Sequence, residues 1–191
     1  MGHREDLLDG AVRCLYEKGY ARTTARDIVA ASGTNLGSIG YHYGSTEALL
    51  NAALMRAIET WGHELAAVLL GPGGEELTGL ARFEAYWTRV LDTMAAHRPM
   101  LVATFDAVLQ MDHAPELRSL LADGMQGARA LWAHVFHQID AAVEREKAQQ
   151  VGSFYQALLT GLIAQWLIDP ANAPSGRDLT EALRAIAAEL A

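Results

Sequence analysis

The stretch SGTNLGSIGYHYGSTEALL, Ser32 to Leu50, decides the fold of the first quarter of the chain. It places four glycines, two tyrosines and one histidine between two helical patterns. A glycine inside a helix costs roughly 0.8–1 kcal/mol relative to alanine. Because the rest of the chain is rich in helix formers, we expect these glycines to allow close approach to another molecule.

The residues before this stretch predict two helices. Apolar residues recur at helical spacing from Leu8 to Tyr16, and Gly19 supplies a stop signal. Thr24, with Asp27 three residues later, has the pattern of a capping box at the start of a second, short helix. Gly33 is expected to end that helix in a left-handed conformation, which glycine adopts without steric cost.

The stretch itself predicts a third short helix over residues 36–43, with Asn35 as its N-cap. Ser45 is expected to cap a fourth helix, which could run on towards Leu70. Two short helices joined by a tight turn with a glycine match a helix-turn-helix. We expect this small head to pack against the fourth helix, because it has too few apolar residues to be stable alone.

The remainder also has helical periodicity and no clean strand pattern. The clearest break is Gly71–Gly79, and further helices are expected over residues 80–97, 99–111, 113–124, 125–147 and 151–168, and from 179 onward. The fold class is therefore all-α. We expect an N-terminal three-helix helix-turn-helix DNA-binding domain at residues 1–46, followed by a helical ligand-binding and dimerisation domain at residues 47–191.

Charge is distributed unevenly along the 191 residues. The net charge is −8, but residues 1–44 contain five basic and five acidic side chains, so the deficit lies downstream. A neutral head permits DNA binding without being diagnostic of it. The single cysteine excludes a disulfide framework, and the N-terminus lacks a signal-peptide pattern, so a cytoplasmic protein is expected. The most apolar run, ALLTGLIAQWLI, is too short to span a bilayer and predicts a buried helix, so no membrane partner is expected.

A helix-turn-helix places its second helix in the major groove of double-stranded DNA, while the first helix crosses the phosphate backbone. Free N–H groups at the start of the second helix of the chain would bind phosphate, and arginines there would add charge. The third helix would present polar groups, an aromatic ring and small residues to the bases. The candidate DNA contacts are Arg22, Thr23, Thr24, Arg26, Thr34, Asn35, Leu36, Gly37, Ser38, Tyr41 and His42.

The segment TTARDIVAASGTNLGSIGYHYGSTEALL closely resembles the DNA-binding signature of the TetR family of transcriptional regulators. The resemblance covers about a quarter of the chain, and turn, caps and core agree together. It implies a ligand-responsive regulator, more often a repressor, that binds a palindromic operator as a homodimer. Leu36 and Thr46 stand where members often have lysines, and Gly40 stands where a tyrosine is common. These departures predict weaker salt dependence or compensation by arginines.

In that family the last two long helices pair with their copies as a four-helix bundle. ALLTGLIAQWLIDP is similar to the penultimate helix, and small residues at helical spacing there would let two helices approach closely. A helix buried within one subunit would have the same pattern. The candidate interface residues are Ala157, Leu158, Gly161, Leu162 and Trp166.

The resemblance also implies a small-molecule effector pocket in the C-terminal domain. Large apolar side chains are plentiful there, as pockets require, and they predict a largely apolar or aromatic effector. An ordinary core would have the same composition. The candidate ligand contacts are Trp61, Phe83, Tyr86, Trp87, Met94, Phe105, Trp132 and Phe136.

Enzymatic function is not supported by the sequence. It contains no phosphate loop, no G-x-S-x-G elbow and no H-E-x-x-H zinc motif, and its carboxylates are scattered. His134 and His137 share a helix, but no tight second group of ligands accompanies them, so neither a metal nor a cofactor is expected. The alternative is an all-α small-molecule sensor or protein-interaction module without specific DNA binding.

Overall fold

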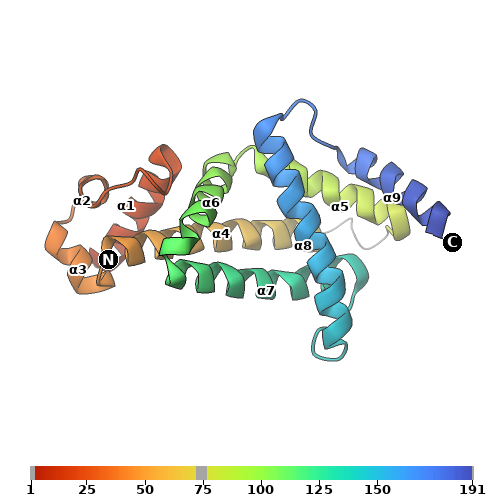
Figure 1. Ribbon diagram of the computed structural model, residues 1–191, viewed down its shortest axis with the longest axis horizontal. Coiled ribbons are helices and arrows are strands. Elements are labelled where there is room, and N and C mark those ends of the chain that lie inside the picture. Colours follow the sequence, from red (N-terminus) through yellow and green to blue (C-terminus); the bar gives the residue numbers. More distant parts are fainter. Residues whose placement is uncertain (1–2, 72–76, 191) are drawn as a thin grey trace. The chain divides into compact units, whose positions relative to one another are not determined.

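The computed structural model describes residues 3–71 and 77–190, and every regular element within them is helical (Figure 1). This confirms the all-α fold class. The elements are α1 (His3–Lys18), α2 (Ala25–Ser32), α3 (Leu36–Tyr43), α4 (Thr46–Leu70), α5 (Gly79–Met94), α6 (Arg98–Gln110), the 3₁₀ turn η1 (Met111–His113), α7 (Pro115–His137), α8 (Arg145–Ile168) and α9 (Gly176–Leu190).

The first helix ends, and the next three begin and end, where the sequence predicts. Gly19 follows α1 with φ 82°, and Gly33 follows α2 with φ 67°, so both use the left-handed conformation that favours glycine. The Ser45 hydroxyl accepts a bond from the Ala48 N–H at 3.0 Å at the start of α4. Within the predicted break at Gly71–Gly79, residues 72–76 lie outside the described residues.

The prediction of one helix over residues 125–147 and a separate, shorter one before it is wrong. One helix, α7, runs from Pro115 to His137 and continues through two glycines, and α8 begins at Arg145. Gln138 ends α7 with φ 57°, and Ile139 in the connection is 5% exposed. The Gln138 and Ile139 N–H groups donate to the His134 and Ala133 carbonyls at 2.7 and 3.3 Å, and Ile139 packs with Ala133 and Ala148, so a local C-cap and apolar packing together end α7.

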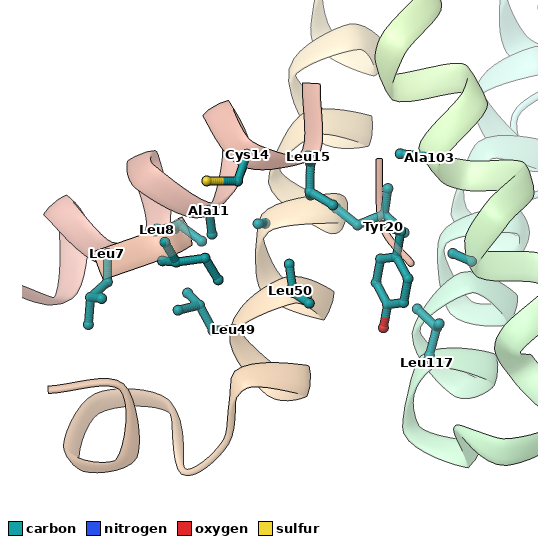
Figure 2. Close-up of a cluster of buried hydrophobic side chains, with 14 of the residues drawn as sticks. Leu7, Leu8, Ala11, Cys14, Leu15, Tyr20, Leu49, Leu50, Ala103 and Leu117 are labelled. Carbon is teal, nitrogen blue, oxygen red and sulfur yellow. The ribbon is translucent and has the colours of Figure 1, made fainter. Parts of the chain in front are cut away.

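The chain divides into two compact units, which are described separately. The first contains the residues up to Gly62 together with His97–Leu121. Its core joins apolar residues of α1, α2, α3, α4, α6 and α7. Figure 2 labels those that come from α1, α4, α6 and α7, together with Tyr20. Leu49, Ala53 and Leu54 of α4 are each 0% exposed in this core, so the small head does pack against the fourth helix.

The second unit contains His63–Ala96 and the residues from Ala122 onward. Within it α5 and α9 lie side by side (Figure 1). A Cβ atom on Gly176 would lie 2.7 Å from the Glu84 carbonyl oxygen, so glycine permits this contact. The predicted domain boundary lies between residues 46 and 47, whereas the two compact units divide within α4, between Gly62 and His63, and α6 belongs to the first unit.

Candidate DNA-binding surface and effector site

The turn between α2 and α3 is held by side-chain caps at both helix starts. The Thr24 hydroxyl accepts from the Asp27 N–H at 3.3 Å, and the Asp27 carboxylate accepts from the Thr24 N–H at 2.9 Å. The Asn35 side chain accepts from the Ser38 N–H at 3.1 Å. These bonds satisfy donors that a helix start leaves free, and they fix the entry into both short helices.

Helix α3 separates a buried side from an exposed one. Ile39 is 3% exposed and belongs to the core of the first unit, whereas Leu36 is 54% and Tyr41 is 86% exposed. The His42 ring meets the Tyr41 ring edge to face, with centroids 4.8 Å apart. A large aromatic side chain that is almost fully exposed on a short helix is available to a partner.

Two glycines of α3 differ in what surrounds them. A Cβ atom on Gly37 would lie 3.2 Å from the Asn35 side-chain oxygen, so a larger residue there would crowd the cap. A Cβ atom on Gly40 would meet no heavy atom within 4 Å. Packing against the described residues therefore does not require glycine at position 40. We expect that glycine is needed there for close contact with a partner.

The basic residues of the head are not equally available. Asp27 binds the Lys18 ammonium at 2.5 Å, and Arg22 donates to the Lys18 carbonyl at 2.8 Å. Arg26 is exposed and makes no hydrogen bond or ion pair with any described residue, so its charge is free for phosphate. The Lys18 ammonium, and then the Thr24 hydroxyl and N–H, hold the pKa of Asp27 at about 2 by bonding its carboxylate.

One predicted DNA contact needs correction. The Thr23 side chain is 7% exposed, and its hydroxyl donates to the Gly19 carbonyl at 2.8 Å. Thr23 therefore closes the link between α1 and α2 and does not offer its hydroxyl to phosphate. Thr34 is part-buried, and its hydroxyl shares a 2.7 Å hydrogen bond with that of Ser32.

The structure adds Arg4 to the candidate DNA surface. Its guanidinium carbon lies 5.4 Å from the centre of the Tyr43 ring, and the Tyr43 hydroxyl donates to its carbonyl at 2.9 Å. Arg4 is exposed, so it adds a positive charge beside α3. The two residues are 39 positions apart, so sequence spacing contains no signal of this proximity.

In the second unit, α5, α7 and α8 contribute to a cluster of aromatic rings. Phe136 stacks on Tyr155 with centroids 4.1 Å apart and the ring planes at 17°. Phe83, Tyr86, Trp87 and Trp132 complete it through ring contacts of 5.5 to 6.3 Å. Five of the eight predicted ligand contacts meet here, together with Tyr155.

The other predicted ligand contacts lie elsewhere. Met94 is fully buried in the second unit, but Trp61 and Phe105 belong to the first unit, where the Trp61 ring lies near that of His97. They are therefore not part of the aromatic cluster. They became candidates because aromatic composition cannot assign a residue to one unit or the other.

The cluster contains an unsatisfied polar group. Trp87 is 0% exposed, and its indole N–H has no hydrogen-bond partner among the described residues. Buried donors in an ordinary core are nearly always paired, and leaving one unpaired costs about 1–3 kcal/mol. This donor is a feature that an ordinary apolar core would not retain.

Two surface hollows are present in the second unit. One, of about 250 Å³, is lined by Arg82, Phe83, Phe136, His137, Tyr155 and Leu183 among others, so it opens onto the aromatic cluster. The other, of about 290 Å³, is lined by residues that include Glu84, Asp92 and Trp166. Sequence composition named Phe83 and Phe136 as ligand candidates, but the hollows themselves could not be predicted, because residues of separate helices combine to form each.

Two titratable groups meet at the first hollow. The His137 imidazole and the Tyr155 hydroxyl share a 2.8 Å hydrogen bond. Burial lowers the pKa of His137, and the positive charges of Arg82 and Lys147 lower it further. Burial raises the pKa of Tyr155 to about 12, against the opposing charge of Arg82. Tyr155 is therefore a neutral phenol at physiological pH.

Helix α8 is less buried than its sequence predicts. By length and composition Arg145–Ile168 could cross a membrane, a test that core helices of other proteins also pass, but only 28% of its most apolar window is buried. Phe154 is 55% and Ile168 84% exposed. The expectation of a buried helix holds for one side of α8, where Leu159 and Leu162 are buried, but the other side is an apolar face without a cover among the described residues.

The predicted interface residues divide between the two sides of α8. Ala157 is exposed, and Leu158, Gly161 and Trp166 are partly exposed. Leu162 is 1% exposed, so it is a core residue of its own chain and has almost no surface left for a partner. Its assignment to an interface is corrected.

Two family models match the chain in succession. Residues 7–53, which contain the caps, the turn and α3, match the N-terminal model of the bacterial regulatory proteins of the tetR family. Residues 78–189 match the tetracyclin repressor-like C-terminal domain. The chain belongs to the tetR family. The TetR N-terminal match ends inside α4, and the C-terminal match covers both hollows and the uncovered face of α8.

Individual relatives agree with this assignment over different lengths. The chain is 41% identical over 49 residues to the HTH-type transcriptional repressor AcnR of Corynebacterium efficiens, which is 26% of each protein. It is 35% identical over 60 residues to the HTH-type transcriptional regulator TtgR of Pseudomonas putida, 31% of this chain and 29% of TtgR. The alignments thus span little more than a quarter of the length of these curated relatives.

The fold extends over the whole TetR chain. The crystal structure of the multidrug binding protein EbrR with imidazole has a TM-score of 0.73 and 22% identity, and covers 97% of this chain and 94% of EbrR. EbrR with ethidium gives a TM-score of 0.71 at 23% identity, covering 96% of this chain and 98% of EbrR. At this identity the likeness establishes the shared fold.

Proposed function

We propose that this TetR-family chain is a homodimeric transcriptional repressor that binds a palindromic operator in the cytoplasm and is released by a small, largely apolar or aromatic effector. The observation that carries the proposal is the exposed side of α3. There Tyr41 is 86% exposed, and Gly40 has open space where a side chain would be. Both features suit a helix that lies in the major groove of DNA.

The charge around this surface supports contact with phosphate. Arg26 is unpaired with respect to the described residues, Arg22 is exposed, and Arg4 lies beside α3. The capping box of α2 bonds the Asp27 N–H, and the Ala25 and Arg26 N–H groups before it remain as donors for phosphate. The N-terminal model of the bacterial regulatory proteins of the tetR family also matches this part of the chain, residues 7–53.

The uncovered face of α8 supports a homodimer. An exposed apolar helix of this length needs a cover, and a second copy would supply an identical face. Two heads are also needed to read two half-sites, which are about 34–36 Å apart in operators of one helical turn. The remaining candidates for this interface are Ala157, Leu158, Gly161 and Trp166.

The aromatic cluster supports an effector site. Its rings, the unpaired Trp87 N–H and the adjoining hollow together offer apolar walls with a few polar groups, as small-molecule sites do. EbrR, which shares the fold, is a multidrug binding protein whose structures contain imidazole and ethidium. We therefore place the effector of this chain in the second unit.

The test is selection of bound fragments from random DNA at near-physiological salt, followed by binding measurements on the selected site. We expect a palindrome. Tyr41→Ala should weaken binding to it by about 1–3 kcal/mol and leave scrambled DNA unaffected, since a lost base contact costs that much. Arg26→Gln should weaken both DNAs and reduce the salt slope by about 1. Arg184→Gln, whose side chain pairs with Glu181 on exposed α9, is the matched control.

Three outcomes would contradict the proposal. If folded protein free of ligand enriches no sequence, the chain is a sensor or an interaction module. If Tyr41→Ala and Arg26→Gln weaken specific and scrambled DNA equally, the two roles assigned here are wrong. If sedimentation shows a monomer at the concentration that binds DNA, the uncovered face of α8 has another partner.

A further inference from the structure

The hollow beside the aromatic cluster has a positive wall. Arg82 lines it and makes no ion pair with any described residue, although the chain has 23 acidic side chains. Lys147 is close enough to lower the pKa of His137, but its own ammonium binds the Glu144 carboxylate at 2.9 Å. Among the described residues that line this hollow there is no aspartate or glutamate. Its fixed charge is therefore the guanidinium of Arg82.

The start of α5 adds to this positive potential. Gly79 and Leu80 line the same hollow, and the N-cap Thr78 makes no side-chain cap hydrogen bond. The first N–H groups of a helix have no partner within the helix, and they carry the positive end of its dipole. Arg82 lies in the first turn of α5, so its positive charge and these donors belong to the same end of the helix that lines the hollow.

The other walls are aromatic and apolar. Phe83, Phe136 and Tyr155 supply rings, and Leu183 of α9 supplies an aliphatic surface. The volume of about 250 Å³ exceeds the roughly 150 Å³ cavity that holds a benzene molecule, so one ring and a small substituent can enter. A ring in contact with these walls would place its substituent within the same small space as Arg82.

We propose that this hollow binds a one-ring aromatic carboxylate, with the carboxylate on Arg82 and the start of α5, and the ring against Phe83, Phe136 and Tyr155. A guanidinium binds a carboxylate through two parallel hydrogen bonds, which fixes the orientation of the ligand. This inference names the chemical class of the effector in the proposed function. It rests on that function only for the consequence of binding and not for the binding itself.

The second hollow provides the contrast. Glu84 and Asp92 lie in its wall with the Trp166 ring, and Arg177 is its basic group. Two carboxylates and an indole suit a cationic ligand, because the ring face and the acids both attract positive charge. A ligand series that differs in charge alone therefore distinguishes the two hollows.

The experiment uses benzoate, benzamide and benzamidine, which share one ring and have charges of −1, 0 and +1 at neutral pH. Their affinities for the full-length protein are measured by calorimetry without DNA. We expect benzoate to bind at least about tenfold more tightly than benzamide, and benzamidine to bind most weakly. Arg82→Gln should remove the preference for benzoate and change the affinity for benzamide by less than about threefold. Arg82→Lys should retain part of the preference.

Arg177→Gln and Arg184→Gln are the matched controls. Arg177 lines the other hollow, and Arg184 lines neither. The inference is overturned if benzamidine binds most tightly, if the three ligands bind equally, or if folded protein binds no benzoate at millimolar concentration. It is also overturned if Arg177→Gln, and not Arg82→Gln, removes the preference for benzoate.

Failure of the proposed function gives a different result. Benzoate that binds through Arg82 without releasing operator DNA would leave the site intact and contradict the effector role. A protein that selects an operator but shows no preference among the three ligands would overturn the site and leave DNA binding intact.

Discussion

Gly40→Ala separates the folding role of a glycine from its role in binding. Gly40 is inside α3, and an added Cβ atom would meet no heavy atom within 4 Å. The substitution should therefore stabilise the free protein, because alanine in a helix interior is favoured by about 0.8–1 kcal/mol. For a chain of this length such a gain raises the melting temperature by about 2–4 °C.

The same methyl group should weaken DNA binding. If α3 lies in the major groove with Gly40 against the DNA, the methyl group must displace one surface or the other. Overpacking of this kind costs about 1–3 kcal/mol, which corresponds to a loss of affinity of about 5- to 150-fold. Thermal unfolding measures the first effect. Fluorescence anisotropy with the selected operator measures the second.

Gly127→Ala is the matched control. Gly127 is exposed inside α7, and an added Cβ atom would also meet nothing within 4 Å. It should stabilise the protein by the same amount and leave DNA affinity unchanged. Unchanged DNA affinity for Gly40→Ala in a stabilised protein would refute the reasoning that this glycine allows close approach to DNA.

Two further substitutions test the packing and the cap. Gly152→Ala should destabilise the protein by at least about 1–3 kcal/mol in urea unfolding, because its Cβ atom would lie 2.6 Å from the Arg129 carbonyl carbon. Asp27, with its pKa at about 2 rather than 3.8, contributes stability that is fully present above about pH 4 and is lost as the pH falls through about 2. Asp27→Asn should reduce stability at neutral pH and flatten the loss between pH 4 and 2.

A specific outcome would contradict each of these two predictions. Stability of Gly152→Ala equal to that of Gly127→Ala would mean that α7 and α8 do not cross closely at Gly152. Parallel acid-unfolding curves for the wild type and Asp27→Asn would show that the bonds to Lys18 and Thr24 do not stabilise the folded carboxylate.

The sequence by itself determined the local architecture of the head. Thr24, Gly33 and Asn35 act within a few residues of their partners, so their spacing alone predicted two capped helices and the turn between them. Helical periodicity, which is also a local property, places Gly40 and Tyr41 away from buried Ile39, so both could be predicted to face a partner.

Tertiary structure decided what depends on contacts between distant segments. At the end of α7, Ile139 packs against Ala148 at the start of the next helix, in addition to its local bond to Ala133. Arg4 reached Tyr43 across 39 positions, and burial removed Thr23 and Leu162 from the surfaces assigned to them. The hollow at Arg82 required four helices to converge. Local hydrogen bonds are encoded by neighbouring residues, whereas burial and cavities arise only when separate helices pack together.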